Sequence, residues 1–202
     1  MRTIMSVAAF MGTAALMSSA WAYPPGVGIL GKSKSCLTCH VNSGPWTDET
    51  KTIVDIVDKE SGKSLKQADG TFLIEAKRFQ LKTVLTVIGR AKGDPAPPPY
   101  RNAWLYIDPA QIESGSLSKF APGWSVDLPM SCRLVGDKAS AYEGAKITAL
   151  PMTVRPLDDA RDAALELHVM LTAGEAVKGD ATKGMLSNCL IRTVRLKVGG
   201  EE

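Results

Sequence analysis

The stretch "LELHVMLT", residues 165–172, alternates apolar and polar side chains and is the clearest sign of the fold class of this chain. In an extended strand, alternate residues point to opposite faces. One face would hold only apolar side chains, namely Leu165, Leu167, Val169 and Leu171. The opposite face would hold Glu166 and His168, which places His168 as a surface histidine. The pattern predicts a half-buried β-strand.

The same period of two recurs elsewhere in the chain. Residues 124–134 alternate, with one face formed by Trp124, Val126, Leu128, Met130, Cys132 and Leu134. Further strands are predicted at 72–75, 81–89, 103–107 and 190–198. Helices are considered only at 50–58, which is equally legible as a strand, and at 157–164. Six or seven strands separated by turn-rich stretches predict a mainly β chain with an antiparallel β-sandwich-like domain.

The first residues predict export. Arg2 precedes an apolar run that ends in Ala20-Trp21-Ala22, the small-x-small pattern of a signal cleavage site. We therefore expect residues 1–22 to be a removed signal peptide, with an uncleaved anchor as the alternative. The expected location is the periplasm or an equivalent lumen. No later apolar run is long enough to span a membrane, so no membrane association is predicted after cleavage.

Composition and cysteine content narrow the function classes. The formal net charge of the whole chain is only +3, which gives no indication of nucleic-acid binding. All four cysteines, at positions 36, 39, 132 and 189, follow the predicted signal. In an oxidising compartment, disulfides are the default expectation for such residues.

Two short motifs overlap in "GVGILGKSKSCLTCH", residues 26–40. Gly26 to Ser33 fits the phosphate-loop pattern GxxxxGK[ST], but a phosphate loop needs a strand before it. Here only Tyr23-Pro24-Pro25 separates the motif from the predicted cleavage site. We therefore interpret these glycines as part of an N-terminal arm and not as a nucleotide site.

The second motif, CxxCH, attaches a c-type haem. Its spacing lets the thiols of Cys36 and Cys39 add to the two haem vinyl groups while His40 binds the iron as the proximal ligand. A thioredoxin-like dithiol is the competing interpretation, but residues 41–46 contain helix-breaking glycine and proline. We predict one covalent haem c, carried by a haem-attachment segment at 23–66, and a β-rich domain at 67–202 that packs on the haem.

The sixth ligand of the iron stays open at this point. The candidates are His168, Met130, Met152, Met170, Met185, Cys132, Cys189 or no protein ligand. A strong sixth ligand favours electron transfer, whereas an open position admits small ligands. Cys132 and Cys189 each fall in a predicted strand, and an inter-sheet disulfide between them is the simplest alternative to iron binding.

An exported chain with CxxCH on a short N-terminal segment, a non-helical body and spare cysteines resembles the small monohaem cytochromes c of anammox bacteria. In that family two related subunits pair, and the haem has His/Cys ligation. The resemblance rests on Cys36-Leu37-Thr38-Cys39-His40 and on this layout. It implies a homologous partner subunit in a heterodimer, and it adds the anammoxosome to the possible locations.

The resemblance also implies that the distal ligand is a cysteine thiolate. Cys132 is favoured, because the stripe from Trp124 to Met130 would form an apolar haem wall, and Cys189 is the alternative. The expected function is a low-potential electron-transfer subunit that works with a redox partner. Binding or sensing of nitric oxide or carbon monoxide is the alternative. An enzyme is less expected, since no clear distal acid or base is present and no catalytic residue is assigned.

Overall fold

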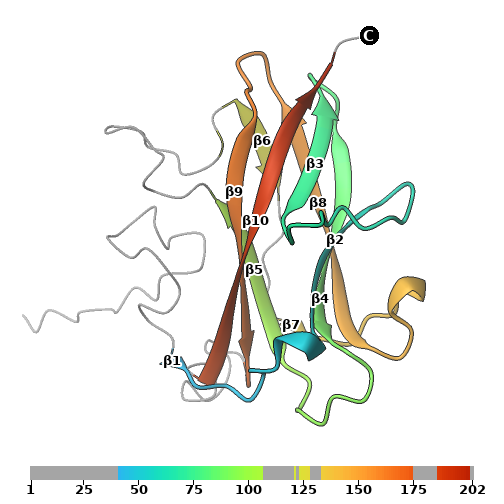
Figure 1. The fold of residues 1–202 in the computed structure, drawn as a ribbon, viewed down its shortest axis with the longest axis vertical. Coiled ribbons are helices and arrows are strands. Elements are labelled where there is room, and N and C mark those ends of the chain that lie inside the picture. Colours follow the sequence, from blue (N-terminus) through green and yellow to red (C-terminus); the bar gives the residue numbers. More distant parts are fainter. Residues whose placement is uncertain (1–40, 107–120, 122, 128–132, 175–185, 201–202) are drawn as a thin grey trace, which may run out of the picture.

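The computed structural model describes residues 41–106, 121, 123–127, 133–174 and 186–200. In these residues the chain is mainly β, as the alternating pattern predicts. Two sheets lie face to face as the two layers of a sandwich (Figure 1). The predicted haem-attachment motif, Cys36 to His40, lies outside the described residues.

The first sheet has six strands and is mixed in direction. Its central pair is β9 (Ala163–Thr172) and the long β10 (Leu186–Gly199), which run antiparallel. β5 (Tyr100–Tyr106) follows β9, and β7 (Arg133–Leu134) follows β5. The far side of β10 pairs in parallel with β1 (Val41–Asn42) at its beginning and with β3 (Phe72–Lys77) at its end.

The second sheet has four antiparallel strands in the order β2, β4, β8, β6. Their bounds are β2 (Thr52–Asp58), β4 (Lys82–Arg90), β8 (Lys146–Pro156) and β6 (Trp124–Asp127). Short 3₁₀ turns, η3 (Glu49–Lys51) and η5 (Ser140–Tyr142), precede β2 and β8.

The main hydrophobic core lies between the two sheets. The apolar face predicted for residues 165–172 is buried there, and it meets Ile56, Val84, Ile88, Met152 and Val154 of the second sheet. Each fully buried aliphatic side chain contributes about 1.5–3 kcal/mol relative to its exposed state. A smaller cluster on the far side of the second sheet joins Val57, Val87 and Ile147 to residues around Tyr142.

Neither helix candidate forms an α-helix in the structure. Residues 52–58 form strand β2, so the strand interpretation of 50–58 is confirmed. The helix considered at 157–164 is wrong, because residues 157–162 connect the two sheets and β9 begins at Ala163. The carbonyl oxygens of Leu157, Asp158 and Ala160 accept hydrogen bonds from the Arg78 guanidinium, whereas a helix would use such carbonyls internally.

The prediction of one strand across residues 124–134 is also wrong. Its beginning is β6 of the four-stranded sheet, and its end is β7 of the six-stranded sheet. Pro129 lies between them and cannot donate to a strand ladder, which argues against one continuous strand. Residues 128–132, with Met130 and Cys132, lie outside the described residues.

Strands begin well before residue 67. Within the predicted haem-attachment segment 23–66, β1 pairs with β10 of the first sheet and β2 pairs with β4 of the second. The chain that directly follows His40 is therefore built into both layers of the sandwich.

Candidate functional site

The outer face of the six-stranded sheet, turned away from the second sheet, gathers several candidate iron ligands. Leu167 and Val169 of β9 point into the core between the sheets. His168 and Met170, which alternate with them, therefore lie on the outer face. Cys189 of β10 pairs directly with Met170, and Ile191 pairs with His168. We call this set, Cys189, Met170 and His168, the ligand cluster.

The register sets the spacing within the ligand cluster. Directly paired residues of antiparallel strands have Cβ atoms about 5 Å apart, and diagonal neighbours are about 7–8 Å apart. Cys189 is thus an immediate neighbour of Met170 and a diagonal neighbour of His168. Three residues with sulfur or imidazole donors therefore lie close together, although they come from two strands joined by a long connection.

Burial differs within the ligand cluster. His168 and Met170 are 1% and 2% exposed, whereas Cys189 is half-buried. The prediction of His168 as a surface histidine is therefore wrong. The sequence alternation correctly assigned its face, but the outer face of this part of β9 is buried as well. His168 Nε2 lies 2.9 Å from Glu166 Oε2, and this carboxylate provides a polar partner for the buried ring.

The strand that follows the CxxCH motif is attached beside Cys189. Val41 pairs with Leu186, and Asn42 pairs with Ser187. The Asn42 side-chain oxygen accepts hydrogen bonds from the Cys189 backbone N–H and from the Asn188 side chain, both at 3.3 Å. Since Val41 is the residue after His40, the structure brings the chain that leaves the motif to the part of β10 that carries Cys189.

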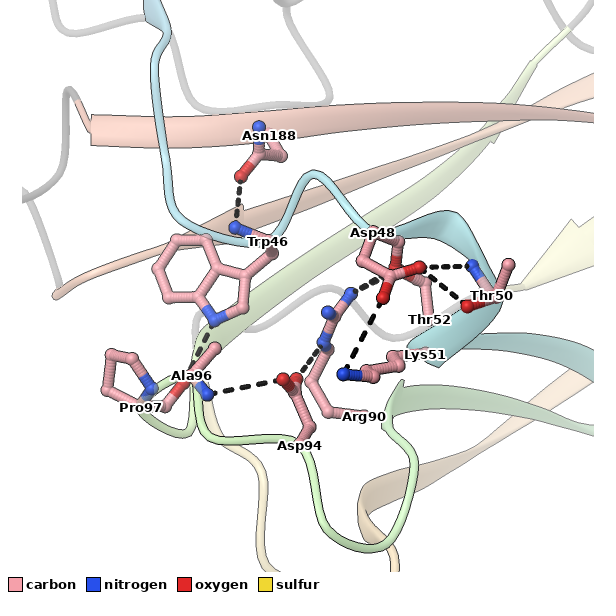
Figure 2. A network of polar contacts seen from close by, with 10 residues as sticks. All are labelled: Trp46, Asp48, Thr50, Lys51, Thr52, Arg90, Asp94, Ala96, Pro97 and Asn188. Carbon is pink, nitrogen blue, oxygen red and sulfur yellow. Dashed lines mark hydrogen bonds and ion pairs between the residues drawn. The ribbon is translucent and has the colours of Figure 1, made fainter.

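Trp46 strengthens this attachment (Figure 2). Its backbone N–H donates to Asn188 Oδ1 at 2.9 Å, and its indole N–H donates to the Pro97 carbonyl oxygen at 2.9 Å. The side chain is 1% exposed and belongs to the main core. Residues 42–46 are therefore held by β10 on one side and by the loop after β4 on the other.

A buried ion pair continues the same network toward the second sheet. The guanidinium of Arg90, at the end of β4, contacts Asp94, Thr52 and the backbone carbonyl of Asp48 (Figure 2). Burial is the largest single influence on the pKa of Asp94 and would raise it. The hydrogen bonds from Arg90 and the Ala96 backbone N–H, together with the positive charges of Arg90 and Lys51, outweigh burial and hold that pKa below its usual value. The segment after the motif is fixed by charged as well as apolar contacts.

The remaining candidate ligands fall elsewhere. Met152 is fully buried on β8 inside the main core, away from the ligand cluster. Met130, Met185 and Cys132 lie outside the described residues, as do Cys36, Cys39 and His40. The pairing of Cys132 with Cys189 and the thiolate role of either one stay predictions.

The described residues contain no group of three or more His, Cys, Asp or Glu side chains placed to hold a metal ion. A haem iron does not need such a group, because the porphyrin supplies four donors and the protein only one or two. The ligand cluster fits that limited requirement, since it offers single donors of the types that bind haem iron. On the neighbouring strand β5, Asn102 pairs with Met170 and Trp104 pairs with His168.

The sequence reasoning missed Asn42 and Asn188, which attach the motif-bearing chain to β10. The alternation of apolar residues could have indicated Asn188. This residue shares the β10 face that carries Leu190, Val194 and Leu196, and a polar side chain on a buried apolar face requires a hydrogen-bond partner. The short β1, only two residues long, left no pattern that could be read.

Comparison with known proteins gives little beyond the fold. No family model matches the chain, and no curated protein matches it. Solved structures similar to it include the PapD-like domain 7 of human CEP192, 14% identical with a TM-score of 0.38, covering 81% of this chain and 96% of that one. Another is a family 123 glycoside hydrolase from Clostridium perfringens, 10% identical with a TM-score of 0.33, covering 75% of this chain and 28% of that one. Neither similarity bears on function.

Among the described residues, no helix has the length and apolar character needed to cross a bilayer.

Proposed function

We propose that this chain is an exported monohaem cytochrome c that acts as a low-potential electron-transfer subunit. When bound, the haem supplies reversible one-electron transfer. Cys36 and Cys39 hold it through thioether bonds, and His40 is the proximal ligand. The observation that carries the proposal is the CxxCH motif, followed directly by a strand that pairs with β10 next to Cys189, with Met170 and His168 on the neighbouring strand β9.

For the sixth ligand, we now favour Cys189 over Cys132. Cys189 lies on β10 where the chain leaving His40 is attached, and it is the most accessible member of the ligand cluster. His168 is already hydrogen-bonded to Glu166, and Met170 is almost fully buried. The stripe that favoured Cys132 in the sequence does not form one strand of one sheet, which removes the geometric reason for that choice.

A thiolate ligand would set the redox role. An anionic sulfur stabilises ferric iron more than ferrous iron, so it lowers the reduction potential. The iron in turn holds the thiol deprotonated. A partner that accepts or donates electrons at low potential follows from this chemistry, and a homologous cytochrome subunit is the partner that the resemblance implies.

The same arrangement supports a second candidate function, binding of nitric oxide or carbon monoxide. Cys189 is half-buried on the edge of β10 between the parts that pair with β1 and β3. Cys189 would hold the iron from this accessible position, and a haem whose sixth ligand is released on reduction would supply one coordination position for a small ligand. Ferrous protein under carbon monoxide separates the two functions, because a pure electron carrier keeps its absorption spectrum and a gas binder changes it.

The experiment that tests the haem assignment is the Cys36→Ala, Cys39→Ala double variant, matured in a host with a cytochrome c assembly system. Covalent haem, measured by haem staining after denaturing electrophoresis, should be absent from the double variant. Thr38→Ala, inside the motif but not a ligand, is the matched control and should keep its haem. A double variant that carries covalent haem would overturn the proposal.

A further inference from the structure

The turn at residues 78–81, between β3 and β4, exposes two large apolar side chains. Phe79 is 62% exposed and Leu81 is 63% exposed, the two highest values among the described large hydrophobic residues. The turn passes from the six-stranded sheet to the four-stranded sheet, so it forms one end of the sandwich (Figure 1). We call residues 78–81 the apolar turn.

The apolar turn is held rigidly. Arg78 donates three hydrogen bonds, at 2.6–3.1 Å, to carbonyl oxygens of the neighbouring connection at 157–160. The Phe79 backbone N–H donates to the Pro156 carbonyl oxygen at 2.8 Å. Phe79 has a φ of 59°, the left-handed region that an aromatic residue rarely adopts. The surrounding contacts therefore fix an unfavourable backbone that turns this ring toward solvent.

The surroundings of the apolar turn carry charges of both signs. Exposed cationic side chains on the adjoining strands and turn are Lys59, Lys63, Lys77 and Arg155. Lys82 is part-buried and pairs with Asp58. The exposed carboxylates nearby are Glu60 on the turn after β2, Glu75 on β3, which pairs with Lys197, and Asp158 and Asp159 on the connection to β9. The stretch 77–82 itself has three cations and no anion.

We propose that the apolar turn inserts into the surface of a lipid bilayer that contains anionic lipid. Two exposed side chains offer on the order of 200 Å² of apolar surface, whereas a stable protein interface buries about 800 Å² on each partner. A patch of this size is too small for a protein interface alone. It suits shallow insertion at the headgroup level, with flanking lysines near anionic headgroups.

This placement keeps the proposed haem site away from the bilayer. Lys77, beside the apolar turn, pairs with Gly199, and Val41, directly after the haem motif, pairs with Leu186. These pairs lie at opposite ends of β10, about 40 Å apart at a strand rise of about 3.3 Å per residue. The inference does not depend on the haem, so its failure would leave the proposed function untouched.

Vesicle sedimentation tests the proposal with the mature holoprotein. The probes are vesicles of equal parts phosphatidylglycerol and phosphatidylcholine, and vesicles of phosphatidylcholine alone. The wild-type protein should bind the anionic vesicles more tightly, and binding should weaken as salt is raised. The variant Phe79→Ser, Leu81→Ser should lose ~10-fold or more in partition coefficient.

Charge variants sharpen the test. Lys77→Gln should weaken binding to anionic vesicles, whereas Asp158→Asn, Asp159→Asn should strengthen it. Lys146→Gln, an exposed lysine that pairs with Arg90 at the far end of β4, is the matched control and should bind as wild type. Thermal melting of each variant checks that it is folded.

Results of two kinds would overturn the proposal, a failure of the binding measurements and an alternative role for the apolar turn. One is wild-type protein that sediments with neither vesicle, or a Phe79→Ser, Leu81→Ser variant that binds as wild type. The other is self-association, seen by sedimentation velocity without lipid and lost in the same double variant, which would assign the apolar turn to a contact between copies of the chain.

Discussion

The two faces of the six-stranded sheet show how differently one strand can be used. On β9, Leu165, Leu167, Val169 and Leu171 face the second sheet and belong to the main core. On the opposite face, His168 and Met170 are buried just as deeply but take no part in that core. The inner face is explained by hydrophobic burial alone. The outer face buries side chains whose chemistry suits iron binding, and packing between the two sheets does not explain them.

The difference predicts that the two faces respond to different experiments. Substitutions on the inner face should change the free energy of unfolding and leave the spectrum of a bound haem unchanged. Substitution of the half-buried Cys189 should do the reverse, whereas substitution of the buried Met170 or His168 should also lower stability.

Leu167→Ala tests the inner face. Leu167 is 0% exposed, and its truncation removes buried apolar atoms and leaves a cavity. We expect the free energy of unfolding to fall by about 3 kcal/mol, measured by chemical denaturation, with the haem absorption unchanged. Thr193→Ala, on the exposed part of the outer face, is the control and should change stability by less than about 0.5 kcal/mol. A shifted haem spectrum in Leu167→Ala would break the division between the faces.

Asn188→Ala tests the attachment of the motif-bearing chain. Asn188 accepts from the buried Trp46 backbone N–H and donates to Asn42, so the variant leaves these groups without their partner. We expect a loss of about 2 kcal/mol in the free energy of unfolding. Hydrogen exchange should also show faster exchange of the Trp46 amide. Unchanged exchange there would mean that other contacts hold this segment.

Thr86→Val tests the opposing wall of the core. Thr86 is fully buried on β4 between Val84 and Ile88, and within the described part of the chain its hydroxyl has no hydrogen-bond partner. Valine has nearly the same shape and no polar atom to leave unpaired. We expect the free energy of unfolding to rise by about 1 kcal/mol. A fall on substitution would show that the hydroxyl is hydrogen-bonded in solution.

The sequence predicts much of the fold because period-two alternation is a local property of a strand. It correctly places β3, β4, β5, β9 and β10 and the inward face of β9. It fails where pairing between distant strands decides the outcome. Residues 124–134 alternate well, yet the two ends of this stretch join different sheets. The burial of His168 depends on which parts of the chain cover the outer face of β9.

The candidate site likewise has one part that a local motif predicts and one part that depends on strand pairing. CxxCH is a local motif, so the attachment residues Cys36 and Cys39 and the proximal ligand His40 can be proposed from the sequence alone. The sixth ligand depends on strand register, which no local pattern shows. The pairing of Cys189 with Met170, and the hydrogen bond from Cys189 to Asn42, appear only in the folded chain.

The proposed sixth ligand of the haem iron is Cys189, on the outer face of the six-stranded sheet. The most direct measurement is the electron paramagnetic resonance spectrum of the ferric wild-type protein beside those of Cys189→Ala and Cys132→Ala. We predict a low-spin thiolate signal in wild type and in Cys132→Ala, and its loss in Cys189→Ala. Loss of the signal in Cys132→Ala alone would contradict the claim, and so would a His/Met or bis-histidine signal that neither substitution changes.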